Sequence, residues 1–148
     1  MFADVDAKNS GAYPQWVSIT IENVGTTDIK LKNLSVSWGK LYGDGEKDME
    51  LPPSEYEGKL IQPNTKLQLN ACNRENSPSG TTGEFDLVDP SANDKLIRNL
   101  CWDCPWSSTR NEWIVRGSNS SFIVESIGGN QDSGALGNIT VNVLKKPE

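Results

Sequence analysis

The sequence predicts an all-β protein, on three observations. Apolar and polar residues alternate with a period of two in several segments, turn-forming residues separate these segments, and no segment shows a convincing helical period of 3.6 residues. Short strands at this spacing are typical of a β-sandwich or barrel. Because a chain of 148 residues usually forms one domain, we expect a single domain over residues 13–148, preceded by a polar extension over residues 1–12.

The first expected strands are Gln15–Val24 and Ile29–Trp38. Apolar residues occupy every second position of the first strand, so one of its faces is buried. In the second strand the apolar residues change parity near Lys32 and Asn33. One inserted residue restores a common face, and we therefore predict a β-bulge at this point.

The rest of the chain continues the pattern. Further strands are expected around residues 67–71, 85–87, 96–97, 100–101, 113–115, 122–124 and 139–143. Turn signals separate them at residues 25–28, 43–45, 77–80, 89–90 and 128–130.

Five tryptophans stand out in a chain with only 35% hydrophobic residues, and three of them lie between Cys101 and Trp113. Tryptophan combines a large apolar ring with one N–H donor, which suits half-wet surfaces such as interfaces and lipid headgroup regions. The alternative for each ring is the core of a small β-protein.

The charge of the chain restricts its partners. The net charge is −6, the isoelectric point is near 4.7, and the 14 basic residues are scattered. Nucleic-acid binding needs a basic stripe, and adsorption to anionic lipids needs a polybasic cluster. We therefore expect no nucleic-acid partner, and any membrane contact should recognise zwitterionic headgroups.

Catalytic and metal-binding patterns are sparse. The chain contains no histidine, which excludes Ser-His-Asp and Cys-His arrangements, and Cys72, Cys101 and Cys104 lack a fourth ligand for a closed zinc site. The three cysteines fit small buried hydrophobes or one local disulfide. Twenty carboxylates leave a glycosidase-type acid pair open, although most such groups are solvated. We predict a non-enzymatic protein with no cofactor and no metal site.

Several segments together resemble the aegerolysins, a family of small acidic proteins of fungi and bacteria. The resemblance runs in one colinear order from Tyr13 to Lys146. The segments are Q-W-V-S-I-T-I-E-N-V-G from Gln15, L-S-V-S-W-G-K-L from Leu34, Y-E-G-K-L-I-Q-P from Tyr56, G-T-T-G-E-F-D-L-V-D-P from Gly80, W-D-C-P-W from Trp102 and D-S-G-A-L-G-N-I-T-V from Asp132.

The resemblance implies a single β-sandwich similar in outline to actinoporins. It also implies binding to sphingolipid membranes that contain sphingomyelin with cholesterol, or ceramide phosphoethanolamine. Several members act with a larger partner of the membrane-attack-complex/perforin class, which forms the pore, and bacterial pairs include insecticidal toxins. No secretory signal is visible, so we expect release without a recognisable signal peptide and action at the target-cell membrane.

The resemblance also implies the membrane-facing residues. Trp16, Trp38 and Trp106 lie in motifs where the family places indoles that enter the headgroup region. Trp102 and Trp113 alternate with apolar strand residues, and we assign both to the core.

Three polar residues complete the predicted site. Asp103 is assigned to a primary ammonium group, with a loop-capping carboxylate as the alternative. Arg110 is assigned to the lipid phosphate through its planar guanidinium, with a solvated side chain as the alternative. Ser79 lies in a loop linked to lipid choice, where some fungal members carry an acidic residue; its presence here leaves the choice between the two sphingolipids open.

Two other functions remain alternatives at this point. A lectin-like module would also use surface tryptophans, to stack on sugars, and free oligosaccharide would then abolish its binding. A structural or developmental surface protein would show no toxic role. A perforin-like gene next to the gene of this chain would favour a two-component toxin.

Overall fold

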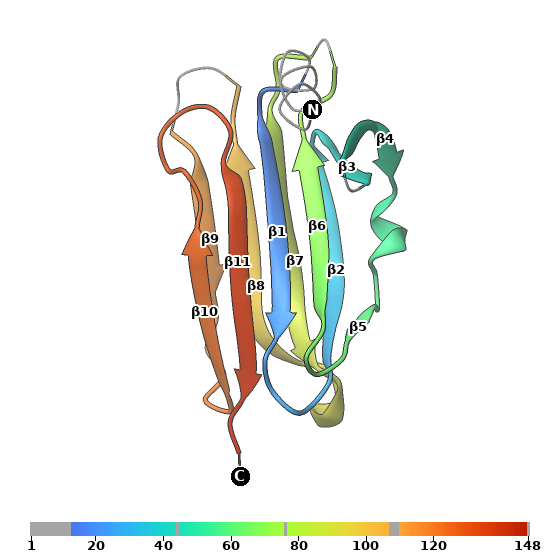
Figure 1. Ribbon diagram of the computed structural model, residues 1–148, viewed down its shortest axis with the longest axis vertical. Coiled ribbons are helices and arrows are strands. Elements are labelled where there is room, and N and C mark those ends of the chain that lie inside the picture. Colours follow the sequence, from blue (N-terminus) through green and yellow to red (C-terminus); the bar gives the residue numbers. More distant parts are fainter. Residues whose placement is uncertain (1–12, 44, 76, 107–109, 148) are drawn as a thin grey trace.

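Two β-sheets packed face to face form the protein (Figure 1). The computed structural model describes residues 13–43, 45–75, 77–106 and 110–147, so the extension expected over residues 1–12 lies outside the described residues. Apart from two short 3-10 turns, η1 (Pro53–Glu55) and η2 (Pro90–Ala92), all regular elements of the described part are strands. The predicted all-β sandwich is confirmed.

The two sheets contain six and five strands. The six-stranded sheet has the order β10 (Phe122–Gly128), β11 (Gly137–Lys145), β1 (Trp16–Asn23), β6 (Lys66–Cys72), β3 (Lys40–Gly43) and β4 (Glu46–Leu51). The five-stranded sheet has the order β5 (Leu60–Ile61), β2 (Ile29–Trp38), β7 (Thr81–Asp89), β8 (Lys95–Cys104) and β9 (Glu112–Arg116). β1 and β11 are parallel, and the other pairs are antiparallel.

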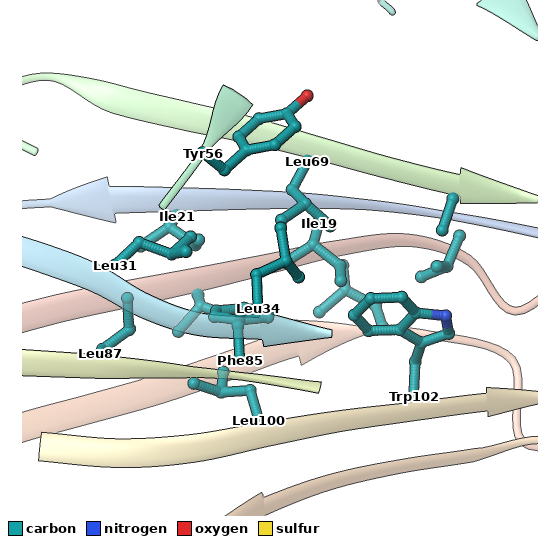
Figure 2. Packing of buried hydrophobic residues seen from close by; sticks show 14 of the residues in the cluster. Ile19, Ile21, Leu31, Leu34, Tyr56, Leu69, Phe85, Leu87, Leu100 and Trp102 are labelled. Carbon is teal, nitrogen blue, oxygen red and sulfur yellow. The ribbon is translucent and has the colours of Figure 1, made fainter. Parts of the chain in front are cut away.

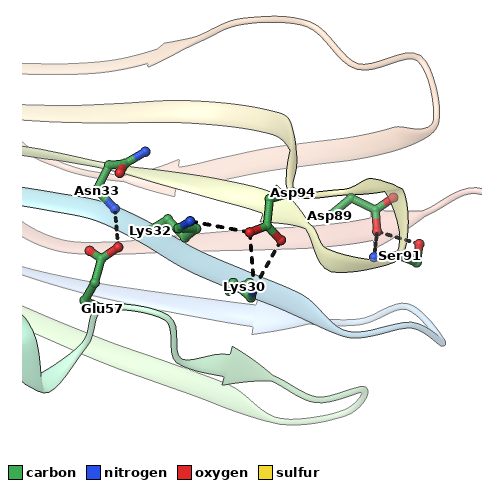
Figure 3. Close-up of polar contacts among 7 residues, drawn as sticks. All are labelled: Lys30, Lys32, Asn33, Glu57, Asp89, Ser91 and Asp94. Carbon is green, nitrogen blue, oxygen red and sulfur yellow. Dashed lines mark hydrogen bonds and ion pairs between the residues drawn. The ribbon is translucent and has the colours of Figure 1, made fainter.

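The bulge predicted in the second strand is confirmed. The register of β2 against β7 shifts between Lys32 and Ser35, and Asn33 has a left-handed backbone with φ of 58°. The Glu57 carboxylate accepts the freed N–H group of Asn33 at 3.0 Å (Figure 3). It also accepts the N–H group of Leu34 at 3.2 Å. The shift brings the apolar residues on both sides of the bulge to the inner face.

The sequence interpretation missed strands β3, β4 and β5. β4 reads Glu-Lys-Asp-Met-Glu-Leu, which lacks the alternation of a half-buried strand, and β5 has only two residues. Residues 96–97 and 100–101 were expected as separate strands but belong to the continuous strand β8. Its register against β7 shifts next to Ile97, which explains the broken parity.

The core lies between the two sheets, and Trp102 is one of its largest fully buried side chains (Figure 2). The indole Nε1 donates a hydrogen bond to Thr81 Oγ1 at 3.1 Å, so its one polar atom is satisfied. Trp113 is half-buried, packs against the same core, and donates through Nε1 to Ser126 Oγ at 2.8 Å. The core assignment of Trp102 is therefore confirmed, and Trp113 borders the core.

The end of the sandwich formed by the turns after β1 and β7 is held by ion pairs. Asp94 contacts Lys30 at 3.1 Å and Lys32 at 3.4 Å, and the Asp89 carboxylate accepts the N–H of Ser91 at the start of η2 (Figure 3). Among the described residues, no helix has the length and apolarity needed to cross a membrane.

We expect Gly83→Ala to destabilise the protein by about 1–3 kcal/mol, because overpacking forces neighbouring groups to move. A Cβ at Gly83 would lie 2.3 Å from Cζ2 of Trp102 and 2.7 Å from the carbonyl oxygen of Ser35. Urea unfolding followed by circular dichroism measures the change. Gly43→Ala is the control, since its Cβ would meet only Met49 Sδ at 3.6 Å. Equal stability of the two variants would contradict this packing.

Candidate functional site

Three of the five tryptophans lie at the other end of the sandwich, which we call the tryptophan end (Figure 1). Trp16 begins β1, Trp38 ends β2, and Trp106 follows β8. The described parts of the β2–β3, β6–β7 and β8–β9 connections meet here. The site residues predicted from the sequence can therefore be placed one by one.

Trp38 extends from a turn that is fixed to the sheets. Its side chain is 59% exposed, and the residue pairs with Thr82 of β7. The next residue, Gly39, has φ of +81°, and a Cβ there would lie 2.3 Å from the carbonyl oxygen of Cys72. Only glycine permits this close approach, so the turn that carries the exposed indole is held against β6.

Ser79 and Trp106 lie on neighbouring loops. Gly80 has φ of +70°, and a Cβ there would lie 2.3 Å from the carbonyl oxygen of Cys104 and 2.8 Å from the backbone nitrogen of Trp106. The segment before β7 therefore packs directly on the segment after β8. Ser79 is half-buried, with its Oγ 2.9 Å from Ser77 Oγ, whereas the Trp106 side chain is 40% exposed.

Asp103 faces outward from β8, just below these loops. Its carboxylate accepts a hydrogen bond from Thr82 Oγ1 at 2.9 Å, and Thr82 pairs with Asp103 on one side and with Trp38 on the other. The hydrogen bond joins two strands rather than the ends of a loop. Asp103 is half-buried and keeps acceptor capacity for a further donor.

Trp16 is at the same end but belongs to the other sheet. It is half-buried, packs against a small cluster of Tyr13, Tyr42 and Cys72, and lies beneath Lys47, whose Nζ is 4.8 Å from the indole centroid. Part of this ring is therefore engaged by the protein itself. The structure brings Trp38, Ser79, Asp103 and Trp106 close together and places Trp16 across the sandwich edge from them.

The cluster under Trp16 contains charged groups. The Tyr13 hydroxyl donates a hydrogen bond to Asp48, and Lys40 Nζ lies 4.6 Å from the Tyr13 ring centroid. The hydrogen bond to Asp48, burial, and the charges of Asp48 and Glu75 all raise the pKa of Tyr13, which keeps the hydroxyl protonated. This network fixes the start of the first strand.

Arg110 is exposed and immediately follows residues 107–109, which lie outside the described residues. No hydrogen bond or ion pair joins it to the part of the chain that is described. The next residue, Asn111, is buried, and its side-chain amide donates to the carbonyls of Asn130 and Gly134 at 2.9 and 3.0 Å. The chain is therefore fixed directly after Arg110.

All three cysteines carry free thiols, so the alternative of a local disulfide is wrong. Cys101 and Cys104 lie on opposite faces of β8, one half-exposed and the other buried. Burial raises the pKa of the Cys72 and Cys104 thiols to about 11, as expected for inert buried groups. Among the residues the structure describes, no group of His, Cys, Asp and Glu could hold a metal ion.

Sequence reasoning missed the residues that shape this end. Gly39 and Gly80 set the two loops, and their position beside Trp38 and Ser79 was the available signal. Lys47 gave none, because its contact with Trp16 depends on the unpredicted strand β4.

Comparison with known proteins places this chain in one family. A family model described as Aegerolysin matches residues 14–146. The chain belongs to the aegerolysin family. Ostreolysin A6 of Pleurotus ostreatus is 58% identical over 135 residues, which cover 91% of this chain and 98% of that protein. Asp-hemolysin of Aspergillus fumigatus is 39% identical over 136 residues, which cover 91% of this aegerolysin and 96% of the relative.

A solved structure is similar along almost the whole length. The crystal structure of IP-1A from Alcaligenes faecalis is 38% identical to this aegerolysin, with a TM-score of 0.83, and the match covers 92% of this chain and 94% of the other. The resemblance inferred from the sequence motifs is therefore confirmed, with no large insertion or missing sheet.

We expect Trp16→Ala and Trp38→Ala to differ in stability. Loss of the half-buried Trp16 removes packing against its cluster and beneath Lys47, and should cost about 2 kcal/mol or more. Loss of the exposed Trp38 should change the free energy of unfolding by less than about 0.5 kcal/mol. Urea denaturation of both variants measures this. A larger loss for Trp38 than for Trp16 would show that the two rings have exchanged roles.

Proposed function

We propose that this aegerolysin is a non-enzymatic receptor for sphingolipid-containing membranes and that the tryptophan end is the part that enters the headgroup region. The observation that carries the proposal is the pair of exposed indoles, Trp38 and Trp106, on adjoining loops. An exposed tryptophan in water is costly, and membrane interfaces are where this side chain is enriched.

Close backbone packing next to both indoles supports this role. Gly39, directly after Trp38, lies against the Cys72 carbonyl, and Gly80 lies against the Cys104 carbonyl and the backbone nitrogen of Trp106, so the backbone beside each indole is held in place. Preorganisation of this kind lowers the entropic cost of association. The indoles are therefore suited to anchor the protein at an interface.

The charge of the protein supports a zwitterionic headgroup. Because the protein has a net charge of −6, general electrostatic attraction does not favour its binding to anionic membranes. A headgroup cation over an indole face gains roughly 0.5–2 kcal/mol, and Trp38 and Trp106 offer such faces. Sphingomyelin and ceramide phosphoethanolamine both satisfy these conditions. We assign Arg110 to a lipid phosphate at the tryptophan end and Ser79 to a loop that contributes to lipid choice.

We further propose that the protein is the small component of a two-component pore-forming toxin. A relative is named a hemolysin, which supports membrane damage as a family activity. The resemblance of the motifs implies a larger perforin-like protein as the partner that forms the pore. In this scheme the aegerolysin acts at the surface of the target cell, after release without a recognisable signal peptide.

Co-sedimentation with vesicles tests the receptor role. Three compositions are compared: phosphatidylcholine alone, sphingomyelin with cholesterol, and ceramide phosphoethanolamine. Binding to either sphingolipid but not to phosphatidylcholine is expected. Equal binding to all three, or to none, would refute sphingolipid recognition, and displacement by free oligosaccharide would point to a lectin-like module.

We expect Trp38→Ala and Trp106→Ala to lose sedimentation with sphingolipid vesicles while keeping thermal unfolding nearly unchanged. Removing an interfacial indole eliminates its membrane contact, and both side chains are exposed. Leu60→Ala is the matched control, because Leu60 is 49% exposed but lies on β5, away from the tryptophan end (Figure 1). If both tryptophan variants still bound the vesicles, the proposal that the tryptophan end contacts the membrane would be wrong.

Dye release separates the two components. Sphingolipid vesicles coated with the aegerolysin alone should retain their dye, and a perforin-class protein encoded by a neighbouring gene should release it only from coated vesicles. Release by the aegerolysin alone would contradict the receptor role.

A further inference from the structure

A hollow lined by both polar and apolar groups lies on the outer face of the five-stranded sheet, directly below the tryptophan end. Its volume is about 260 Å³, and strands β2, β7, β8 and β9 provide its lining. This is somewhat below the roughly 300–1,000 Å³ of pockets for drug-sized ligands, and suits a fragment as small as a lipid headgroup. Asp103 is the one lining residue predicted from the sequence as part of a site, because outward polar residues on a sheet otherwise look like ordinary solvated surface.

The strand register arranges the hollow in rows across the sheet. The first row aligns Thr82, Asp103 and Glu112, and the second aligns Glu84, Cys101 and the apolar Ile114. Alternation along each strand sends these side chains to the outer face, while the residues between them belong to the inner one. Between the first two rows, Gly83 and the buried Trp102 opposite it form the floor of the hollow.

The third row adds the positive charge. Arg116 lies opposite Asn99, one row beyond Cys101, and its side chain also lines the hollow. Burial raises the pKa of the Cys101 thiol. The positive charge of Arg116 lowers this pKa, and the negative charges of Glu84 and Asp86 raise it further. The Cys101 thiol therefore lies near the guanidinium of Arg116 and the carboxylates of Glu84 and Asp86.

Several of these charged groups keep free capacity. Asp103 accepts from Thr82, and Glu84 accepts from the Asn99 amide at 3.0 Å. Glu112 and Arg116 are both exposed, and neither has a hydrogen bond or ion pair with any residue in the described ranges. A ligand with a cation near Asp103 and Glu112 and an anion near Arg116 would complement both ends.

The lining also distinguishes between kinds of cation. Protein sites recognise quaternary ammonium groups with aromatic faces. Trp102 is the one aromatic residue in the lining, and it is fully buried, while Trp38 stands outside the lining. The available groups are oxygen acceptors: the carboxylates of Asp103, Glu84 and Glu112 and the Thr82 hydroxyl. Such acceptors suit a primary ammonium, which donates hydrogen bonds that a trimethylammonium cannot.

We propose that this hollow binds a phosphoethanolamine-type zwitterion, with its ammonium at Asp103 and Glu112 and its phosphate at Arg116. The claim that the hollow binds a lipid headgroup rests on the proposed membrane function. The claim that it binds the free zwitterion does not. The assignment deepens the proposed function by adding a headgroup contact on the sheet face, while Arg110, Ser79 and the indoles at the tryptophan end contact the surrounding lipids.

Cys101 provides a direct probe of occupancy. It lines the hollow and is half-exposed, whereas Cys72 and Cys104 are fully buried. In the native protein a thiol reagent at mildly alkaline pH should therefore modify Cys101 first. O-phosphoethanolamine should slow this reaction, and phosphocholine should need about tenfold higher concentration, since it loses the charged hydrogen bonds of the primary ammonium.

Matched variants assign the effect to the hollow. Glu112→Gln and Arg116→Gln should each weaken protection by O-phosphoethanolamine by about tenfold, the worth of one charge-assisted contact. Glu125→Gln is the control, because Glu125 is likewise exposed on an outer strand, β10, but belongs to the other sheet. Circular dichroism and thermal unfolding confirm that each variant is folded.

The outcomes separate this proposal from the membrane function. Absence of protection by O-phosphoethanolamine, equal protection by phosphocholine, or equal effects of the Glu125 control would overturn the hollow as an ammonium site. Protection of Cys101 by the free zwitterion without any binding to ceramide phosphoethanolamine vesicles would uphold the site and refute the membrane role. Binding to the vesicles without protection of Cys101 by the free zwitterion would uphold the membrane role and refute the site in the hollow.

Discussion

The contact between Trp102 and Gly83 is the constraint on which the rest of the structure depends. The indole fills the space between the sheets only because Gly83, the residue opposite it in the register, carries no side chain. Its Nε1 is bonded to Thr81, the first residue of β7. The contact therefore fixes the pairing of β7 with β8 near their ends at the tryptophan end. The loops that carry Ser79 and Trp106 adjoin this pair of strands, and the hollow lies on its outer face.

Strand alternation then divides the chemistry of β8 between two environments. Trp102 and Cys104 point inward and are fully buried, whereas Cys101 and Asp103 between and beside them point outward. One short segment thus supplies a core indole, an inert thiol, an accessible thiol and a carboxylate. A C-x-x-C spacing suggests a redox pair in some folds, but on a strand positions i and i+3 face opposite sides. The geometry of the strand excludes the disulfide.

Much of the fold could be predicted from the sequence because alternation reports burial directly. The bulge near Asn33 followed from a change of parity, and the inward orientation of Trp102 followed from its apolar strand neighbours. Strands β3 and β4 were not predictable in this way, since β3 is short and β4 is mostly charged. Lys47 of β4 covers Trp16, a long-range contact that local sequence patterns do not report.

The candidate site shows the same limit. The positions of exposed tryptophans could be inferred from motifs, but the hollow depends on Thr82, Asp103 and Glu112, which come from three strands and align only through register. The two surfaces also differ in what they can contribute. Indoles at an interface provide affinity for almost any headgroup region, because their gain comes mainly from apolar area and ring faces. Paired charges in a hollow provide discrimination, because a ligand that cannot donate to them leaves them unsatisfied. The proposed receptor function needs both at a net charge of −6, since general electrostatics favour neither approach to a membrane nor a choice of lipid.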